Sequence, residues 1–240
     1  MSGAGDSERS AAIQSSVAVG LAVSAYGVSF GALGVASGLD VWQTCLLSLL
    51  MFSGGSQFAL IGVLASGGTA AGAAAITSAV LLGARNALYA IRVAPIVGPG
   101  WPKRLLAAQW TIDETTAVST AQSTPEAQRA GFWWTGVIIY VGWNITTLIG
   151  ALIGDLLGDV RQYGLDAAAA AAFLGLVWPR LKGLQPIAVA AAALVVATVL
   201  VPFVPAGVNV LVAAAIAVVV GIFNLFGRKE APVGGGGAAP

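Results

Sequence analysis

Residues 81–116 read LLGARNALYAIRVAPIVGPGWPKRLLAAQWTIDETT, and this stretch decides how the chain can fold. Arg85 and Arg92 lie in one apolar run, and Asp113 and Glu114 lie in the next. A charged side chain at the depth of a bilayer costs roughly 3 kcal/mol on insertion scales. Such residues persist where they are paired, hydrated or needed. We therefore expect these four charges to mark the functional site.

The composition around this stretch is that of a membrane protein. Of the 240 residues, 58% are hydrophobic and only 9% are charged, and the mean hydropathy is +0.88. Soluble domains carry about 25% charged residues, so we predict an all-α polytopic membrane protein embedded in a lipid bilayer. The net charge of +1 indicates no nucleic-acid partner. With no histidine and a single cysteine, Cys45, the sequence predicts no metal, no cofactor and no Ser-His chemistry.

The apolar runs predict seven or eight transmembrane helices. We expect a polar N-terminal tail over residues 1–12, frayed from the helix that follows, one transmembrane transporter domain over 13–227, and a disordered tail over 228–240. The predicted helices cover residues 13–35, 41–65, 70–97, 132–157, 165–177, 184–201 and 208–226.

The eighth candidate is residues 105–123, where Gln109, Asp113, Thr116 and Thr120 form a polar stripe at helical spacing. This segment is either a span that faces the protein interior or a shorter, partly inserted helix. The distribution of Lys and Arg favours seven helices with a cytoplasmic C-terminus, which would separate Arg9 from Lys103, Arg104 and Arg129.

A second feature is the sequence FSGGSQF at residues 52–58. Gly54 and Gly55 weaken the helix, while Ser53, Ser56 and Gln57 bring hydrogen-bonding groups to mid-membrane. One interpretation is a plain helix with a glycine packing notch. We prefer a break that faces a substrate, because irregular backbone at this depth is tolerated where it is buried or lines a cavity.

A weak internal repeat is also present. FGAL at 30–33 with GLD at 38–40 recurs as IGAL at 149–152 with GLD at 164–166. This repeat suggests two related halves, which would be inverted under the seven-helix count. Inverted halves are common in transporters.

These motifs together resemble the AzlC family of branched-chain amino acid permeases. The family pattern reads approximately F-A-G-x-x-Q-F, N-L-R-H-x-L-Y-G, A-P and T-D-E. The matching residues here are Phe52, Gly54, Gln57, Phe58, Arg85, Leu88, Tyr89, Ala94, Pro95, Asp113 and Glu114, with Trp143, Thr147 and Gly150 in a later helix. Two departures concern the charged stretch. Asn86 stands where the family has histidine, and Arg92 stands where a small residue is common.

The resemblance implies a multi-pass secondary transporter in the plasma membrane of a prokaryote, not an enzyme. It also implies export of a branched-chain or similar small hydrophobic amino acid, proton coupling, and a small AzlD-like membrane subunit. An oligomer is equally compatible with the sequence. The alternatives are a carrier of a different small zwitterion or anion, or a non-transporting partner subunit.

The roles expected at the site follow from the chemistry of a zwitterion. Arg85 would receive the carboxylate as a planar fork, with Tyr89 on the same helical face. Asp113 or Glu114 would receive the ammonium or a proton, and Trp110 would offer an apolar wall. The blander alternative is that Arg85 and Arg92 only neutralise Asp113 and Glu114.

Overall fold

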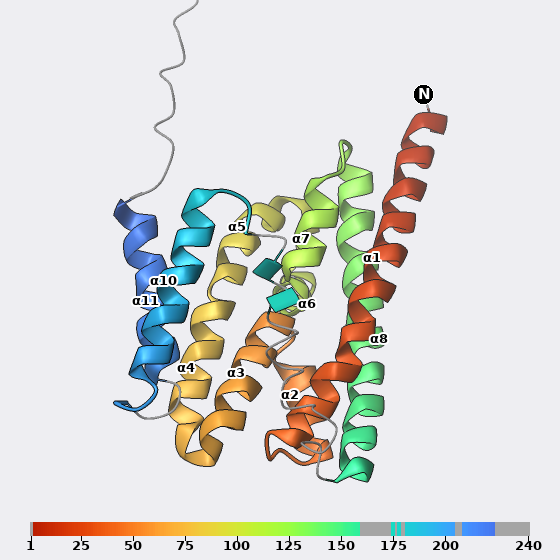
Figure 1. The fold of residues 1–240 in the computed structure, drawn as a ribbon. Coiled ribbons are helices and arrows are strands. Elements are labelled where there is room, and N and C mark those ends of the chain that lie inside the picture. The colour runs from red at the N-terminus through yellow and green to blue at the C-terminus, as the bar shows by residue number, and fades with distance from the viewer. Residues whose placement is uncertain (1, 159–173, 176, 179–180, 205–207, 224–240) are drawn as a thin grey trace, which may run out of the picture. The chain divides into compact units, whose positions relative to one another are not determined.

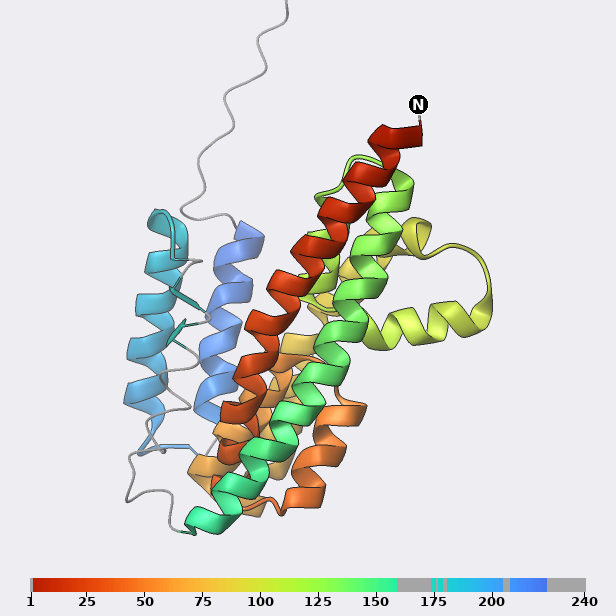
Figure 2. The same cartoon turned by 90° about the vertical axis from the view of Figure 1, so that its right-hand side faces the viewer.

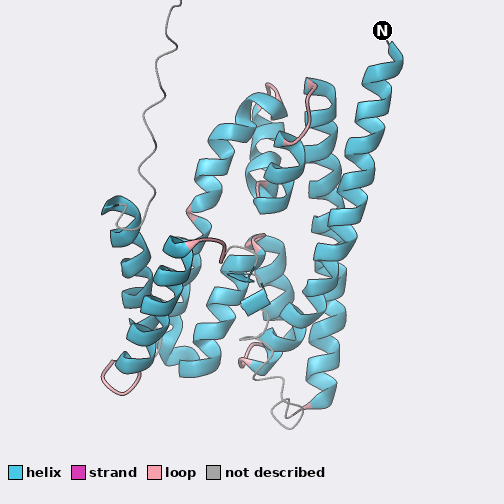
Figure 3. Cartoon of the chain, turned by 45° about the horizontal axis from the view of Figure 1, so that its top comes forward, coloured by secondary structure: helices cyan, strands magenta, loops and turns pink. Residues whose placement is uncertain are grey.

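The described part of the chain consists of helices joined by short loops and turns. The computed structural model describes residues 2–158, 174–175, 177–178, 181–204 and 208–223, and every regular element in them is a helix (Figure 3). The all-α prediction is therefore confirmed for these residues. The chain divides into two compact units, Met1–Leu174 and Gly175–Pro240. That residues 13–227 form one domain stays a prediction, and the predicted tail over 228–240 and most of the predicted helix over 165–177 lie outside the described residues.

The first unit holds most of the helices. In chain order they are α1 (Ser2–Ala36), α2 (Val41–Leu50), α3 (Gly54–Gly67), the 3-10 helix η1 (Gly68–Ala71), α4 (Gly72–Gly83), α5 (Arg85–Val97), α6 (Trp101–Trp110), α7 (Asp113–Thr120) and α8 (Pro125–Leu157) (Figure 1). The second unit holds α10 (Leu184–Leu200) and α11 (Val208–Phe223), which pack against each other. This confirms the final helical pair that hydropathy predicts.

The long helices α1 and α8 lie side by side and run in the same direction (Figure 2). Ser16 in the first half of α1 donates a hydrogen bond to the Gly131 carbonyl near the start of α8 (3.3 Å). Farther along, Gly31 lies directly against the backbone of Thr147 and Ala151. Small residues allow this close approach, as they do between helices in lipid.

The N-terminal residues differ from the prediction. Residues 2–12, expected as a frayed polar tail, are the first turns of α1. Ala12 is fully buried, and Ala127 of α8 is fully buried as well. Packing against α8 therefore extends the helix beyond the apolar run that hydropathy detects.

The segment from α2 to α3 is a hairpin, which we call the first hairpin. Its start lies at the C-terminal end of α1, where Thr44 packs against Gly34. Its tip lies at the middle of α8, where the rings of Phe52 and Tyr140 are 5.0 Å apart. After the tip, α3 turns back and leads through η1 into α4, which packs along it.

Helices α4 and α5 then carry the chain to the opposite end of the unit. There the Arg129 side chain, near the start of α8, donates a hydrogen bond to the Ile96 carbonyl in the last turn of α5 (3.1 Å). The first hairpin therefore begins and ends at the end of the unit where α1 finishes.

The segment from α6 to α7 is the second hairpin, and it enters from the other end. Three residues separate the end of α5 from the start of α6, which runs roughly at right angles to the long helices on the side of α8 (Figure 2). Its last residue, Trp110, reaches mid-helix on α8, with its ring 5.7 Å from that of Tyr140. Helix α7 then returns, because Thr120 at its end lines a hollow together with Gln128 near the start of α8.

Two expectations for these segments need correction. Residues 41–65 were expected to form one interrupted span, whereas the chain turns back at the interruption. Residues 105–123 form neither a continuous span nor a single inserted helix, because the chain breaks at Thr111–Ile112 and returns. In the described part, three stretches are long and apolar enough to cross a membrane: Gly5–Ala36, Gly54–Val97 and Pro125–Leu157. The second of them folds back on itself at η1.

Candidate functional site

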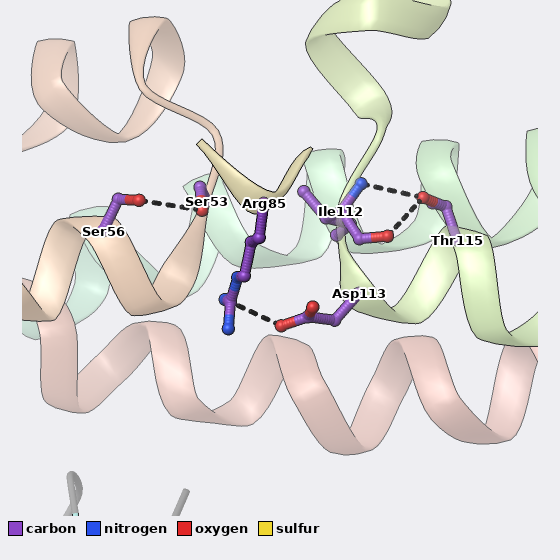
Figure 4. Close-up of polar contacts among 6 residues, drawn as sticks. All are labelled: Ser53, Ser56, Arg85, Ile112, Asp113 and Thr115. Carbon is purple, nitrogen blue, oxygen red and sulfur yellow. Dashed lines mark hydrogen bonds and ion pairs between the residues drawn. The ribbon is translucent and has the colours of Figure 1, made fainter. Parts of the chain in front are cut away.

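Three interruptions of helix meet about midway along α8. They are the tip of the first hairpin, the junction of α4 and α5, and the tip of the second hairpin. Figure 4 shows Ser53, Arg85 and Asp113 converging from these three places. A helix interruption leaves backbone polar groups without intrahelical partners, so a polar centre can form inside an apolar helical unit.

An ion pair joins the central junction to the second hairpin. Arg85 Nη2 lies 2.7 Å from Asp113 Oδ2, and each side chain is 24% exposed. Asp113 is the first residue of α7, where a carboxylate is favoured by the positive end of the helix dipole. Arg85 Nε is buried and has no hydrogen-bond partner among the described residues. The guanidinium therefore has donor capacity beyond its pair with Asp113.

The same guanidinium lies against the first turn of α3. A Cβ atom at Gly55 would lie 2.9 Å from Arg85 Nη2. Any residue other than glycine would therefore displace the guanidinium from this position. Beside it, the Ser53 hydroxyl donates to the Ser56 hydroxyl (3.2 Å), and both serines are buried (Figure 4). Ser56 also faces α4, because a Cβ at Gly83 would lie 3.1 Å from Ser56 Oγ.

At the first tip, the backbone carbonyls that end α2 and the backbone amides that open α3 differ in their hydrogen bonding. The carbonyls that end α2 are satisfied by side chains from elsewhere. Gln109 of α6 donates to the Leu49 and Leu50 carbonyls (3.0 and 3.1 Å), and the Tyr140 hydroxyl also donates to Leu49 (3.3 Å).

The amide groups that open α3 have no such partners. Ser53 at the N-cap makes no capping bond through its side chain. Within the described residues, no hydrogen bond satisfies the N–H groups of Gly54, Gly55 or Ser56. These donors face the same region as Arg85, so the first tip offers donors and few acceptors.

Gln57 holds the first tip in place. Its amide nitrogen donates to the Met51 carbonyl (2.7 Å) and the Ser48 carbonyl (3.4 Å), and its oxygen accepts from Trp143 Nε1 (2.9 Å). Gln57 is fully buried, and the Trp143 ring stacks on Phe30. Its hydrogen-bonding groups are thus engaged with the protein.

The second tip is held by Thr115. The Ile112 N–H donates to Thr115 Oγ1 (3.0 Å), and the Thr115 hydroxyl reaches the Trp110 carbonyl (2.8 Å). These bonds cap the N-terminus of α7, so that the helix begins at Asp113. The Thr115 hydroxyl therefore fixes the position of the Asp113 carboxylate.

The remaining predicted residues lie at different distances from the centre. Tyr89 is half-buried one turn beyond Arg85 on α5, and Glu114 follows Asp113 in the first turn of α7. Trp110 packs against Tyr140 and Trp133, and its Nε1 is buried with no partner in the described part of the chain. Arg92 is exposed and lines a separate hollow with Pro95, Ile96, Thr120 and Gln128.

Some residues that support the site were not predicted to do so. Tyr140 and Gln109 satisfy the end of α2, and Thr115 fixes the start of α7. One signal was present in the sequence, since Tyr140, Trp143 and Thr147 recur at helical spacing on one face of α8. Their partners could not be read from that spacing.

The comparisons with known proteins identify a family. A family model described as AzlC protein matches residues 18–157, which is more than half of the 240 residues. No curated protein and no solved structure matches the chain. The matched range contains both hairpins, the ion pair and α8.

Proposed function

The chain belongs to the AzlC family, and from this premise we propose that it is a secondary transporter that exports branched-chain or similar small hydrophobic amino acids. Membrane-length apolar helices support a place in a membrane, and we take this to be the plasma membrane of a prokaryote. The family motifs Arg85 and Asp113 lie together at the centre of the matched range.

The observation that carries the proposal is the position of Arg85. Its guanidinium uses one nitrogen for Asp113 and lies against the opening turn of α3. A cation beside the positive end of a helix is repelled, and Asp113 supplies one anion that offsets this repulsion. A substrate carboxylate would meet the guanidinium and the open amides of Gly54, Gly55 and Ser56 together.

Asp113 is the natural partner for the substrate ammonium. Its carboxylate lies 2.7 Å from the guanidinium, so the two charged ends of an amino acid would find opposite charges at about their own separation. Ser53 and Ser56 would add neutral hydrogen bonds. Trp110 and Tyr89 would form walls for the side chain, and in this proposal Gln57 shapes the pocket rather than binding in it.

Proton coupling would follow if a proton and the substrate ammonium compete for the Asp113 carboxylate. A carboxylate that has taken up a proton no longer attracts an ammonium group. Protonation from outside would therefore release the amino acid, and loss of the proton inside would allow the next one to bind. Glu114, the next residue of α7, is the second candidate for this role, and Arg92 would tune the charge from the hollow at the end of α5.

The competing explanation is that Arg85 and Asp113 merely neutralise each other. Removing one partner of a buried pair destabilises a protein by about 3–5 kcal/mol, so an inactive Arg85→Ala variant would not separate the two explanations. The informative change is Arg85→Lys, which keeps the charge and the attraction to Asp113 but loses the planar fork.

The test is efflux of radiolabelled leucine, isoleucine, valine and methionine from loaded vesicles, with and without a coexpressed AzlD-like protein. We expect saturable efflux that an uncoupler abolishes, and at least about tenfold slower efflux in Arg85→Lys, since a hydrogen bond to a charged group contributes roughly 1.5–3 kcal/mol. Arg92→Lys is the matched control and should retain the wild-type rate.

Two further results complete that test. The charge exchange of Arg85→Asp with Asp113→Arg should restore thermal stability without restoring transport. Wild-type efflux in Arg85→Lys would show that the arginine serves only to neutralise a charge.

We also propose that the transmembrane domain consists of two inverted halves. The hairpins support this, because they enter from opposite ends and meet tip to tip. The FGAL and IGAL repeat does not, since α1 and α8 run in the same direction and its second GLD lies outside the described residues. The count of seven or eight transmembrane helices stays a prediction.

A small AzlD-like subunit is the partner that we propose, with a homo-oligomer as the alternative. If none of the four amino acids moves, a carrier of another zwitterion or anion becomes the better hypothesis, or a non-transporting partner subunit. The feature that favours a changed substrate is Asn86, whose Oδ1 is buried and lacks a partner among the described residues. Substrate counterflow separates any carrier from a pore.

A further inference from the structure

A hollow of about 290 Å³ lies beside the N-terminal parts of α1 and α8, and neither residue of the ion pair lines it. We call it the α1–α8 hollow. It is lined by Arg9, Glu126, Arg129, Ala130, Trp133 and Trp134. Two arginines from different helices thus face one space on the outside of the helical unit. Within the described residues, neither arginine forms an ion pair with Glu126.

Arg129 is held ready for a ligand. Its Nε donates to the Ile96 carbonyl (3.1 Å), which belongs to the last turn of α5. A cation at the C-terminal end of a helix is favoured by the helix dipole, so the guanidinium is fixed by α5. Among the described residues no hydrogen bond or ion pair engages its two Nη groups, and a guanidinium presents them in a planar fork that matches phosphate oxygens.

The aromatic residues place the hollow at a membrane interface. Trp133 is held rigid by Phe132 and Trp110, with ring centroids 5.2 and 5.9 Å away. Trp134 is 46% exposed on the adjacent face of α8. Tryptophan is enriched at the level of lipid headgroups, where one side of the ring is apolar and the other is wet.

We propose that the α1–α8 hollow binds the headgroup of an anionic phospholipid of the phosphatidylglycerol type. Two arginines against one glutamate leave the hollow with a charge of +1, which matches the single negative charge of this lipid. The arginines would hold the phosphate diester. Glu126 would accept hydrogen bonds from the glycerol hydroxyls, which a bare phosphate lacks. Basic pockets between transmembrane helices bind anionic headgroups in this way.

The location gives the bound lipid a structural effect. Through Arg129 it would brace the end of α5, and through Trp133 it would support Trp110 at the second tip. The inference rests on the hollow alone and does not depend on which substrate the protein transports.

The experiment measures lipid retention by native mass spectrometry and thermal unfolding in nanodiscs. The full chain is compared in phosphatidylglycerol, phosphatidylcholine and phosphatidylethanolamine. We expect preferential retention of phosphatidylglycerol and a higher midpoint of unfolding in it. Arg9→Gln should weaken retention about five-fold, the effect of one basic residue near an anionic surface. Arg9 is an exposed residue, so this variant should fold normally.

Arg104→Gln is the matched control, because Arg104 is an exposed arginine of α6 outside the hollow. Equal losses in Arg9→Gln and Arg104→Gln would overturn the proposal, since they would indicate only a general attraction to basic surface. Equal retention of phosphatidylethanolamine would also overturn it. A soluble glycerol phosphate that competes as well as the lipid would assign the hollow to a free phosphate ester instead.

Discussion

At the scale of single residues, Gly55 has the most direct consequence for the candidate site. A methyl group there would lie 2.9 Å from Arg85 Nη2 and 3.4 Å from Leu82 Cδ2. The guanidinium is the flexible end of a long side chain, so it can move away and the protein can still fold. We therefore expect Gly55→Ala to weaken the apparent affinity for substrate about tenfold, equivalent to roughly 1.4 kcal/mol, with little change in thermal unfolding.

The control for that prediction is Gly72→Ala. Gly72 has open space where a side chain would begin, since nothing lies within 4 Å of an added Cβ. Efflux kinetics in Gly72→Ala should match wild type. An unchanged KM in Gly55→Ala would show that the contact between Gly55 and Arg85 does not position the arginine for substrate.

The sequence predicted which residues belong to the site better than it predicted which of them contact each other. Arg85 and Asp113 were identified because charge is costly in an apolar run, and that cost is local. The pairing of Arg85 with Asp113 depends on the direction in which each hairpin returns, and no local pattern encodes that. Gln57 shows the same limit, because its partner Trp143 lies 86 positions away in the chain.

At the scale of elements, the first tip depends on the bond between Gln57 and Trp143. Gln57→Ala removes the partner of the buried Trp143 N–H, while the Met51 carbonyl keeps its bond from the Ser53 N–H (2.8 Å). Leaving such a group unsatisfied costs about 1–3 kcal/mol, so the midpoint of thermal unfolding in detergent should fall. Trp143→Phe removes the same bond from the other side. The double variant should therefore lose less than the sum of the two single losses.

A suitable control is Gln122→Ala, which removes only a local bond to the Val118 carbonyl (2.9 Å) near the end of α7. It should change stability by less than about 0.5 kcal/mol. Strictly additive losses for Gln57→Ala and Trp143→Phe would mean that the two side chains support the structure independently.

The helix breaks were only partly predictable. Gly54 and Gly55 indicated the first interruption, because two glycines weaken a helix. Nothing comparable marks the second, where Thr111 and Ile112 are not helix breakers and Thr115 supplies the turn. Hydrophobic periodicity reports which face of a helix is apolar but not whether the chain crosses or returns. The first hairpin was therefore predicted as a span, and the second was left open between a span and a partly inserted helix.

At the scale of the whole molecule, the hairpins change where the basic residues lie. Neither a seven-helix nor an eight-helix count places Arg9, Lys103 and Arg129 on one side. In the structure Arg9 and Arg129 line one hollow, and α6 with Lys103 begins just after α5 ends beside Arg129. A hairpin that returns to its own side changes the assignment of every loop that follows it.

This arrangement predicts the orientation of the first unit. Among its described residues, five of the six Lys and Arg lie toward the end where α1 and α8 begin, namely Arg9, Arg92, Lys103, Arg104 and Arg129. The sixth, Arg85, lies at the centre, and the described residues at the other end include Asp40 and Asp155. Because basic loops remain in the cytoplasm, we expect α1 to begin on the cytoplasmic side.

Cysteine labelling in whole cells can measure that orientation, since Cys45 is the one cysteine in the sequence and can be replaced by serine. In that background, Thr69→Cys lies in the exposed turn η1 and Lys103→Cys lies at the basic end. A membrane-impermeant maleimide should label Thr69→Cys in intact cells and Lys103→Cys only after permeabilisation. The reverse pattern would place the basic end outside the cell. Labelling of both positions in intact cells would mean that α4 and α5, which join them, do not carry the chain across the membrane.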